Sequence, residues 1–184
     1  DAFYNNAFNV NADKVVNNSL DNNIFWASWY NYYRVIKQAN AVIKFTPQVL
    51  EAGGISAEKA DDVMGQAYCL RAFTYFWIIR IWGDAPLVTA PYLDSNDSFD
   101  LPKAAVADIV EQIHSDLENA SNMIDKNSTS RTTFTQTAAY AINAHVYAWE
   151  HKYEETINMA DKVLTNTNYT LANLYDEKYT GTTD

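Results

Sequence analysis

The sequence predicts an all-α protein made of tetratricopeptide-like helical hairpins that stack into an α-α superhelix. Apolar residues recur at intervals of three or four through most of the 184-residue chain, which is the spacing of one face of an α-helix. Glycine, proline and short polar clusters interrupt this pattern where successive helices would end. The length fits a single domain, residues 1–184.

The chain is expected to begin with an irregular segment followed by a long helix. Residues 1–19 contain many asparagines and show no helical spacing, so we expect a leading loop there. From Phe25 to Ile43 the apolar residues step by three or four along one stripe, which predicts a helix over about 20–46. The pattern ends near Pro47, because proline lacks the backbone N–H that a helix interior needs.

A second helix is expected at the centre of the molecule. Ser56 can accept hydrogen bonds from the free N–H groups at the start of a helix that begins near Ala57. From Phe73 to Trp82 this helix is apolar on almost every side, which favours complete burial. Gly83 allows the left-handed turn that often follows a helix, so we expect the helix to stop there.

A third helix should follow an extended loop over residues 87–100. We expect it to open directly after Pro102, since proline is tolerated in the first turn of a helix. Its apolar stripe is the most regular in the chain and consists of Val106, Ile109, Ile113, Leu117, Ala120 and Ile124. Its solvent-facing side is expected to carry Asp108, Glu111, Asp116 and Glu118.

The last two expected helices form a tetratricopeptide-like hairpin over residues 134–165. They are predicted at about 135–150 and 153–164. Only His151 and Lys152 separate them, and a connection this short forces the two helices to lie antiparallel. Alanines recur in both helices and would let them approach closely, as in tetratricopeptide units.

Charge and cysteine content narrow the possible functions. The chain has 13 basic and 23 acidic side chains, which gives 13 − 23 = −10 at neutral pH. This net charge repels the phosphates of nucleic acids, so we expect no nucleic-acid partner. The single cysteine, Cys69, cannot form an internal disulfide and lies in an apolar run, where we expect it in the core.

The sequence contains no recognisable motif for catalysis or metal binding. The three histidines, His114, His145 and His151, are not three or four residues apart, so no helix face presents paired imidazoles to a metal. His114 and Glu118 are expected to form an ordinary surface pair on one helix. There is no strand-turn motif for a nucleophilic serine and no glycine loop for phosphates. We therefore predict a protein that binds rather than catalyses, without metal or cofactor.

The aromatic content suggests a sugar ligand. Thirteen tyrosines, eight phenylalanines and five tryptophans are present, and aromatic rings stack on sugars while tyrosine and asparagine bind hydroxyl groups. Most of these rings, such as Trp29 and Tyr33, follow the helical stripe and are expected in the core. The candidate ligand-binding residues lie in the leading loop and are Tyr4, Asn5, Asn6 and Phe8. A frayed terminus is the alternative interpretation of this cluster.

Two arginines stand on the apolar second helix. Arg71 and Arg80 are nine residues apart and have mostly apolar neighbours in the sequence. Burying an unpaired guanidinium group costs several kcal/mol, by order of magnitude, so each must reach solvent or meet a carboxylate. We expect structural ion pairs for both.

The run from Gly65 to Val88 reads GQAYCLRAFTYFWIIRIWGDAPLV and resembles the signature of the SusD/RagB family. That signature joins a helix with leucine-arginine-alanine and tyrosine-phenylalanine steps to a glycine-aspartate-x-proline-leucine turn. The residues that match it as a structural motif are Arg71, Tyr75, Phe76, Arg80, Gly83, Asp84 and Pro86. With the neighbouring helices in register, the resemblance covers about residues 20–175.

The resemblance implies a SusD-like helical fold and a non-catalytic lipoprotein on the extracellular face of the outer membrane. Such a protein binds oligosaccharides or other nutrients and covers a TonB-dependent, SusC-like transporter. The resemblance implies membrane attachment only through a lipid anchor, whose cysteine is absent from this chain. Because the family's proteins are much longer, the chain resembles an amino-terminal portion of one.

Two other functions are compatible with the residues. An intracellular tetratricopeptide scaffold would bind peptides in the concave face of its superhelix. A helical glycan-processing enzyme would need two facing carboxyl groups roughly 5 to 10 Å apart in an open cleft. The sequence does not identify the ligand, because loop shape rather than a motif determines sugar specificity.

Overall fold

The computed structural model describes residues 28–92 and 100–166. Within them the chain forms five α-helices and one pair of short strands. The helices are α2 (Tyr30–Glu51), α3 (Ala57–Trp82), α4 (Val106–Met123), α5 (Gln136–Trp149) and α6 (Tyr153–Leu164). The strands β1 (Ala85–Pro86) and β2 (Lys103–Ala104) pair antiparallel, with Ala85 opposite Ala104. The predicted all-α class is confirmed.

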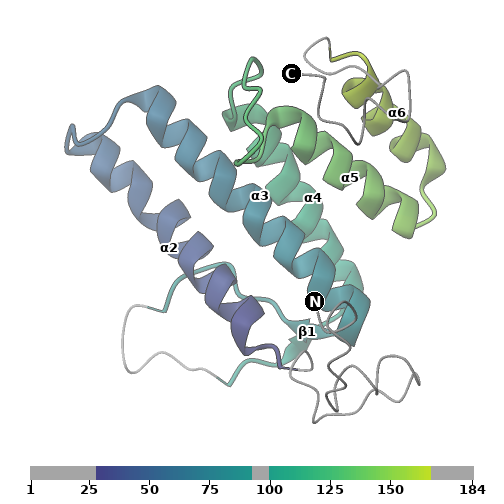
Figure 1. Cartoon of the computed structure of the whole chain (residues 1–184). Helices are drawn as coiled ribbons and strands as arrows, with labels where there is room; N and C mark the ends of the chain where they lie inside the picture. Colours follow the sequence, from purple (N-terminus) through teal and green to yellow (C-terminus); the bar gives the residue numbers. More distant parts are fainter. Residues whose placement is uncertain (1–27, 93–99, 167–184) are drawn as a thin grey trace, which may run out of the picture.

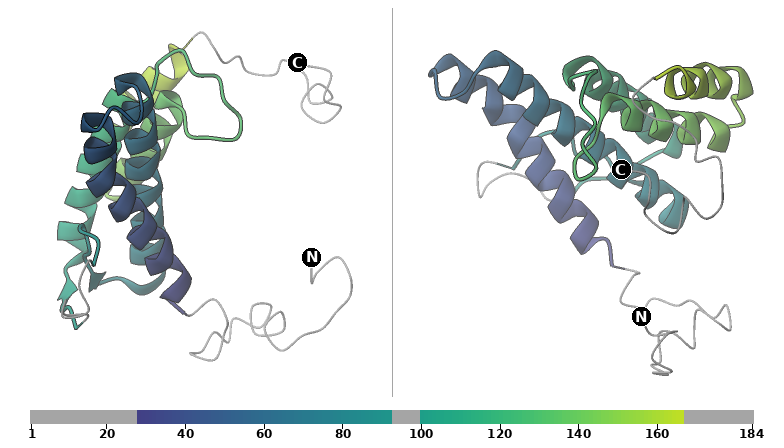
Figure 2. Two further views of the ribbon diagram at one scale, coloured as in Figure 1. Left: turned by 90° about the vertical axis from the view of Figure 1, so that its left-hand side faces the viewer. Right: turned by 45° about the horizontal axis from the view of Figure 1, so that its top comes forward.

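The helices stack side by side, each against the next one along the chain. Helix α3 packs between α2 and α4, and α5 packs between α4 and α6 (Figure 1). The two further views show the same order of helices (Figure 2). Helices α5 and α6 run antiparallel and turn at His151, whose backbone adopts a left-handed φ of 63°. The sequence predicted this stack of hairpins.

The hydrophobic core lies mainly between α3 and α4, and α2 and α5 close it from either side. Its largest fully buried apolar side chains are Ile36 from α2, Tyr75 and Ile78 from α3, Ile109, Ile113 and Leu117 from α4, and Val146 from α5. The stripe predicted for α4 is therefore buried from Ile109 onward, as is Cys69. Both expectations are confirmed.

Helix α3 begins and ends as expected but is not buried on every side. The Ser56 hydroxyl accepts a hydrogen bond from the Lys59 backbone N–H at 3.2 Å, and Gly83 follows the helix with φ of 72°. One stripe of α3 remains between 36% and 48% exposed and consists of Leu70, Phe73, Trp77 and Ile81. The prediction of complete burial was wrong for this stripe, because α2 and α4 cover only part of the circumference of α3.

Helix α2 differs from the sequence prediction at its end. The helix continues through Pro47 to Glu51, whereas the sequence placed its end near residue 46. Packing against α3 and burial of Thr46 hold this turn although Pro47 offers no hydrogen bond. The helix starts at Tyr30, and residues 20–27 of the predicted helix lie outside the described part of the chain.

Helix α4 begins three residues later than predicted, at Val106 instead of Lys103. Instead of continuing from Pro102 into a helix, Lys103 and Ala104 pair with β1. The Asp84 carboxylate then accepts a hydrogen bond at 3.0 Å from the backbone N–H of Val106, the first residue of α4. A partner from the preceding turn therefore fixes the start of the helix, and local sequence around Pro102 does not reveal such a partner.

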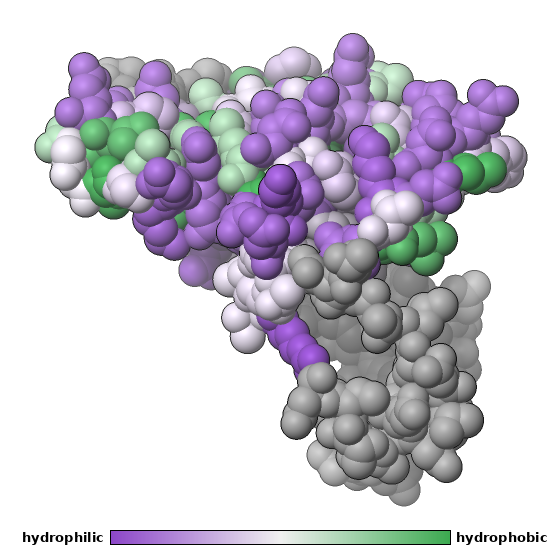
Figure 3. Space-filling view, turned by 90° about the horizontal axis from the view of Figure 1, so that it is seen from above, coloured by the Kyte–Doolittle hydropathy of each residue, from purple (hydrophilic) through white to green (hydrophobic). Residues whose placement is uncertain are grey.

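The surface of the molecule is largely hydrophilic when seen from above (Figure 3). The strongest hydrophobic colour lies near the two edges of this view, over the end where α2 meets α3 and over α5 and α6. No helix in the described ranges is long and apolar enough to cross a bilayer. The leading loop expected over residues 1–19 lies outside those ranges.

Candidate ligand-binding groove

A cavity of about 540 Å³ lies between the first half of α2 and the segment that follows β1. We call it the α2 groove. Its lining residues are Trp29, Tyr30, Tyr33, Arg34, Ile36, Lys37, Gln38, Pro86, Val88, Ala90, Tyr92 and Leu101. A second cavity of about 440 Å³ lies farther along α2, between residues 40–48 and 89–91. Ala90 lines both cavities, so the segment over residues 86–92 forms one wall along α2.

Aromatic side chains form one end of the α2 groove. Trp29 is stacked on Trp82, with ring centroids 6.1 Å apart and planes at 28°. The Tyr33 hydroxyl donates a hydrogen bond of 2.7 Å to the carbonyl oxygen of Pro86, and burial raises the pKa of this hydroxyl. Tyr30 is 68% exposed at the rim. Rings that are fixed from behind and open to solvent suit stacking on a sugar ring.

The same groove carries positive charge. Arg34 and Lys37 line it, and Lys44 lines the neighbouring cavity, while neither cavity has an acidic lining residue among those described. The Arg34 guanidinium lies 5.6 Å from the centroid of the Tyr30 ring. The Lys103 ammonium lies 5.7 Å from the centroid of the Trp29 ring. Two cations therefore lie close to aromatic rings at this end of the groove.

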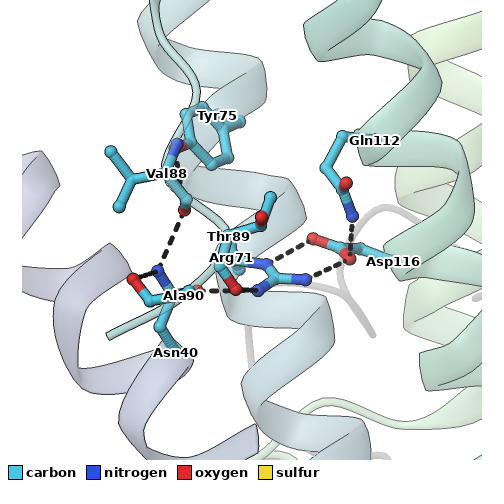
Figure 4. A network of polar contacts seen from close by, with 8 residues as sticks. All are labelled: Asn40, Arg71, Tyr75, Val88, Thr89, Ala90, Gln112 and Asp116. Carbon is cyan, nitrogen blue, oxygen red and sulfur yellow. Dashed lines mark hydrogen bonds and ion pairs between the residues drawn. The ribbon is translucent and has the colours of Figure 1, made fainter. Parts of the chain in front are cut away.

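The wall of the groove is fixed by buried polar side chains (Figure 4). Asn40 of α2 is fully buried, and its amide nitrogen donates to the carbonyl oxygens of Val88 at 2.9 Å and Ala90 at 3.2 Å. The Tyr75 hydroxyl accepts a hydrogen bond of 2.7 Å from the Val88 N–H, and burial raises the pKa of this hydroxyl to about 12. Together these contacts hold the backbone of the wall from α2 and α3.

Arg71 joins this wall to α4. Its guanidinium donates to the Asn40 side-chain oxygen at 2.6 Å and to the Thr89 carbonyl at 3.1 Å. It also forms a bidentate ion pair with Asp116, with distances of 2.8 and 2.7 Å. Gln112 donates a further hydrogen bond of 2.8 Å to the Asp116 carboxylate. The predicted ion pair of Arg71 is confirmed.

The prediction that Asp116 faces solvent was wrong. This residue was expected on the solvent side of α4, yet it is 0% exposed. Its position on the helix is adjacent to the buried Leu117, and the carboxylate turns toward α3 because the buried Arg71 guanidinium requires a negative partner. The other three acids of the predicted polar side, Asp108, Glu111 and Glu118, are exposed as expected.

Arg80 does not form the predicted ion pair in the described part of the chain. It is exposed, and its guanidinium lies over the rings of Phe76 at 4.3 Å and Trp77 at 4.2 Å. It also donates a hydrogen bond of 3.3 Å to the Phe76 carbonyl. The charge reaches solvent along the helix surface, which avoids the cost of burial without a carboxylate.

The remaining motif residues shape the end of α3 and the turn that follows. Phe76 is buried and contacts Trp149 edge-on at 6.3 Å, which links α3 to α5. Gly83 supplies the left-handed turn, and the Asp84 carboxylate accepts a hydrogen bond from the first N–H group of α4. The Pro86 carbonyl accepts a hydrogen bond from the Tyr33 hydroxyl. These positions therefore support the groove wall and the turn before it.

The sequence did not reveal the cluster of side chains around His114, at the contact between α4 and α5. The His114 ring is within hydrogen-bond distance of Asn143 at 2.7 Å and of Glu150 at 2.6 Å. It stacks on Tyr147 with ring centroids 4.0 Å apart. The expected pair with Glu118 is replaced by these contacts, because packing of α5 on α4 brings residues more distant in sequence to the imidazole.

The described residues provide no group of side chains arranged to hold a metal ion. Burial raises the pKa of the Cys69 thiol to about 12, so this thiol is protonated at neutral pH and is a poor nucleophile. The predicted ligand-binding residues Tyr4, Asn5, Asn6 and Phe8 lie outside the described ranges. Trp29 and Tyr33 were expected in the core, and the structure shows that they are partly buried against it and also line the α2 groove.

Comparison with known proteins identifies similar sequences. A SusD-like family model, described as "Starch-binding associating with outer membrane", matches residues 1–148. SusD-like protein P38 of Formosa agariphila is 27% identical over 162 residues, which cover 85% of this chain and 30% of that protein. SusD-like protein P2 of the same bacterium is 30% identical over 158 residues, which cover 83% of this chain and 30% of that protein. The chain thus spans less than a third of these relatives.

Solved structures share the helical architecture. A SusD superfamily protein from Bacteroides vulgatus superimposes with a TM-score of 0.79 at 24% identity, over 90% of this chain and 36% of its own. A laminarin-binding SusD-like protein gives 0.73 at 24% identity, over 83% and 34%. A structure with a xylogluco-oligosaccharide gives 0.68 at 25% identity, over 81% and 31%.

Proposed function

Because the chain belongs to the SusD-like family, we propose that it is part of a glycan-binding protein and that the α2 groove contributes to the ligand site. The single observation that carries the proposal is the groove itself. Three aromatic side chains of the groove, Trp29, Tyr30 and Tyr33, stand next to hydrogen-bonding and charged groups on α2. Sugar sites combine these two elements, because rings stack on C–H faces while polar groups bind hydroxyls.

The names of structural neighbours support sugars as the ligand class. One neighbour is described as laminarin-binding, and another was solved with a xylogluco-oligosaccharide. Since this chain spans about a third of each neighbour, the whole protein would complete the site with residues beyond those of the α2 groove. We infer an oligosaccharide as ligand and assign no particular sugar.

We also propose a place for the whole protein on the extracellular face of the outer membrane. The family description, which names association with that membrane, supports this location. A lipid anchor would attach the protein, and a TonB-dependent, SusC-like transporter would take over the bound oligosaccharide. Protease treatment of intact cells tests the location, and co-purification with the transporter under mild detergent tests the partnership. Full protection from protease would contradict the surface location.

Calorimetric titration of the full-length protein with a panel of oligosaccharides tests glycan binding. We expect saturable binding that weakens in Tyr30→Ala, since this ring is 68% exposed at the groove and its removal leaves the core intact. Tyr153→Ala is a matched control, because Tyr153 is 63% exposed on α6 and does not line the groove. Equal affinities of the two variants for the oligosaccharide would show that the α2 groove does not contribute to the ligand site.

The proposed role is capture without turnover. We expect chromatography to recover each bound oligosaccharide unchanged after long incubation with the full-length protein. Release of shorter sugars would contradict this role and favour a glycan-processing enzyme. Binding of peptides instead of sugars would favour the tetratricopeptide scaffold.

A further inference from the structure

We propose that the α2 groove recognises an anionic sugar, one that carries a carboxylate or a sulfate ester. The inference rests on the proposed glycan binding and specifies the class of glycan. It is carried by the net positive charge of α2, which is opposite in sign to the net charge of the whole chain. No similar protein described above has a name that indicates a charged ligand.

The sign of the local charge is opposite to that of the whole molecule. The chain has 23 acidic and 13 basic side chains. Helix α2 nevertheless carries Arg34, Lys37 and Lys44, and its only acid is Glu51 at the last position. All three cations line the two cavities beside the groove wall, and no acidic residue of the described ranges does so. An anion entering the groove therefore meets attraction within a molecule that repels it elsewhere.

The positive charges of Arg34 and Lys37 are not neutralised by carboxylates of the described residues. Among the described residues, Arg71, Lys59 and Lys152 form ion pairs, whereas Arg34 and Lys37 do not. The Arg34 guanidinium lies 5.6 Å from the centroid of the Tyr30 ring, and the Arg34 and Lys37 side chains are exposed at the groove. Their charges are thus available to a ligand without the cost of breaking an existing ion pair.

The spacing along α2 suits an extended ligand. Lys37 and Lys44 are seven residues apart, which places them on one side of the helix about 10 Å from each other. Arg34 stands one turn before Lys37, beside the aromatic end of the groove. A sugar ring stacked at Tyr30 could therefore present its anionic group to Arg34 while later units pass the lysines. The planar guanidinium can bind two oxygens of a carboxylate or sulfate at once.

The test compares matched ligands that differ in charge. The full-length protein is titrated with oligogalacturonate and its methyl ester, and with sulfated dextran oligosaccharides and unmodified dextran oligosaccharides. Arg34→Gln and Lys37→Gln remove one positive charge each from the groove. Lys126→Gln is the control, because Lys126 is exposed in the loop after α4 and lines neither cavity.

We expect at least one anionic ligand to bind more tightly than its neutral partner. The pair with the larger difference in affinity shows whether the groove prefers a carboxylate or a sulfate. Each groove variant should weaken that binding about two- to fivefold, as for an exposed ion pair, and Lys126→Gln should not. Equal binding of charged and neutral partners would overturn this inference and leave the proposed glycan binding in place. Failure of every oligosaccharide, including neutral glucans, would overturn both.

Discussion

At the scale of single residues, the ion pair between Arg71 and Asp116 accounts for the position of the groove wall. Both side chains are at most 4% exposed, and Asn40, Gln112 and the Thr89 carbonyl provide their further hydrogen bonds. No buried side-chain nitrogen or oxygen in the described ranges lacks a hydrogen-bond partner. A buried charge is tolerated only under these conditions. The pair therefore couples the fold of α3 and α4 to the segment that lines the groove.

Asp116→Asn should strongly destabilise the protein. The substitution keeps the shape of the side chain but leaves the buried Arg71 charge without a partner. We expect a loss of about 3–5 kcal/mol in the free energy of unfolding, measured by urea denaturation. Glu111→Gln on the exposed side of α4 is the control and should have little effect. Similar losses in both variants would show that the ion pair does not support the fold.

The contacts of Glu150 predict a dependence of stability on pH. Burial raises the pKa of Glu150, but hydrogen bonds from Lys152 and His114 together outweigh this and bring the pKa below its ordinary value. A carboxyl with a lower pKa in the folded state stabilises the protein above its unfolded pKa. This contribution disappears as pH falls through the folded pKa.

The measurement is the free energy of unfolding of the natural protein and of Glu150→Gln, from neutral pH to below the ordinary carboxyl pKa of about 4.3. We expect the natural protein to be more stable at neutral pH and the difference to shrink as the carboxyl becomes protonated. A difference that stays constant over this range would show that the charge of Glu150 does not contribute.

At the scale of the helices, Gly65 permits the close approach of α3 and α4. A Cβ atom at this position would lie 2.7 Å from Ile124 Cγ1 and 3.2 Å from Met123 Cβ. Alanine is favoured over glycine in helices by about 1 kcal/mol, yet this clash should outweigh that gain. We expect Gly65→Ala to lower the free energy of unfolding by about 1–3 kcal/mol.

A double-mutant cycle separates this clash from other effects. If Ile124 causes the loss, Gly65→Ala should cost much less in the Ile124→Ala background, where the clashing atom is absent. An equal cost in both backgrounds would place the strain elsewhere. Thermal and urea unfolding of the four proteins provide the comparison.

Pro47 is a second feature of helix packing that a substitution can test. It lies inside α2 and cannot donate a hydrogen bond to the carbonyl of Ile43. Pro47→Ala restores this bond, while it also increases the freedom of the unfolded chain, which offsets part of the gain. We expect a net stabilisation of about 1 kcal/mol or more, measured by urea denaturation. A loss of stability would mean that the proline ring itself packs favourably.

At the scale of the whole molecule, the exposed stripe of α3 distinguishes this chain from a fully enclosed helical stack. Leu70, Phe73, Trp77 and Ile81 lie on one side of a central helix and remain partly exposed. Apolar patches of this kind attract other apolar groups. We expect the 184-residue chain by itself to bind a hydrophobic dye with enhanced fluorescence.

Trp77→Gln should reduce this dye binding without lowering the midpoint of thermal unfolding, because the ring is 40% exposed and outside the core. Val49→Gln removes an apolar side chain that is 44% exposed at the far end of α2 and serves as the control. Equal fluorescence from both variants would show that the α3 stripe is not the site of dye binding.

Sequence periodicity alone was sufficient to predict much of this architecture. The boundaries of α5 and α6, the start of α3 at Ala57, its end before Gly83 and the buried stripe of α4 all agree with the prediction. These features depend on residues within a few positions of one another. Helical spacing, a capping serine and a left-handed glycine act locally, so they can be recognised without knowledge of the fold.

Only the tertiary structure decided the features that depend on distant partners. Asp116 is buried because Arg71 stands opposite it, 45 positions earlier, and α4 starts at Val106 because Asp84 reaches its first N–H group. The α2 groove likewise exists because residues 86–92 lie against α2, held by Asn40. Periodicity shows which face of a helix is apolar, but it does not specify which polar group of another element will meet that helix, because this depends on how the elements pack.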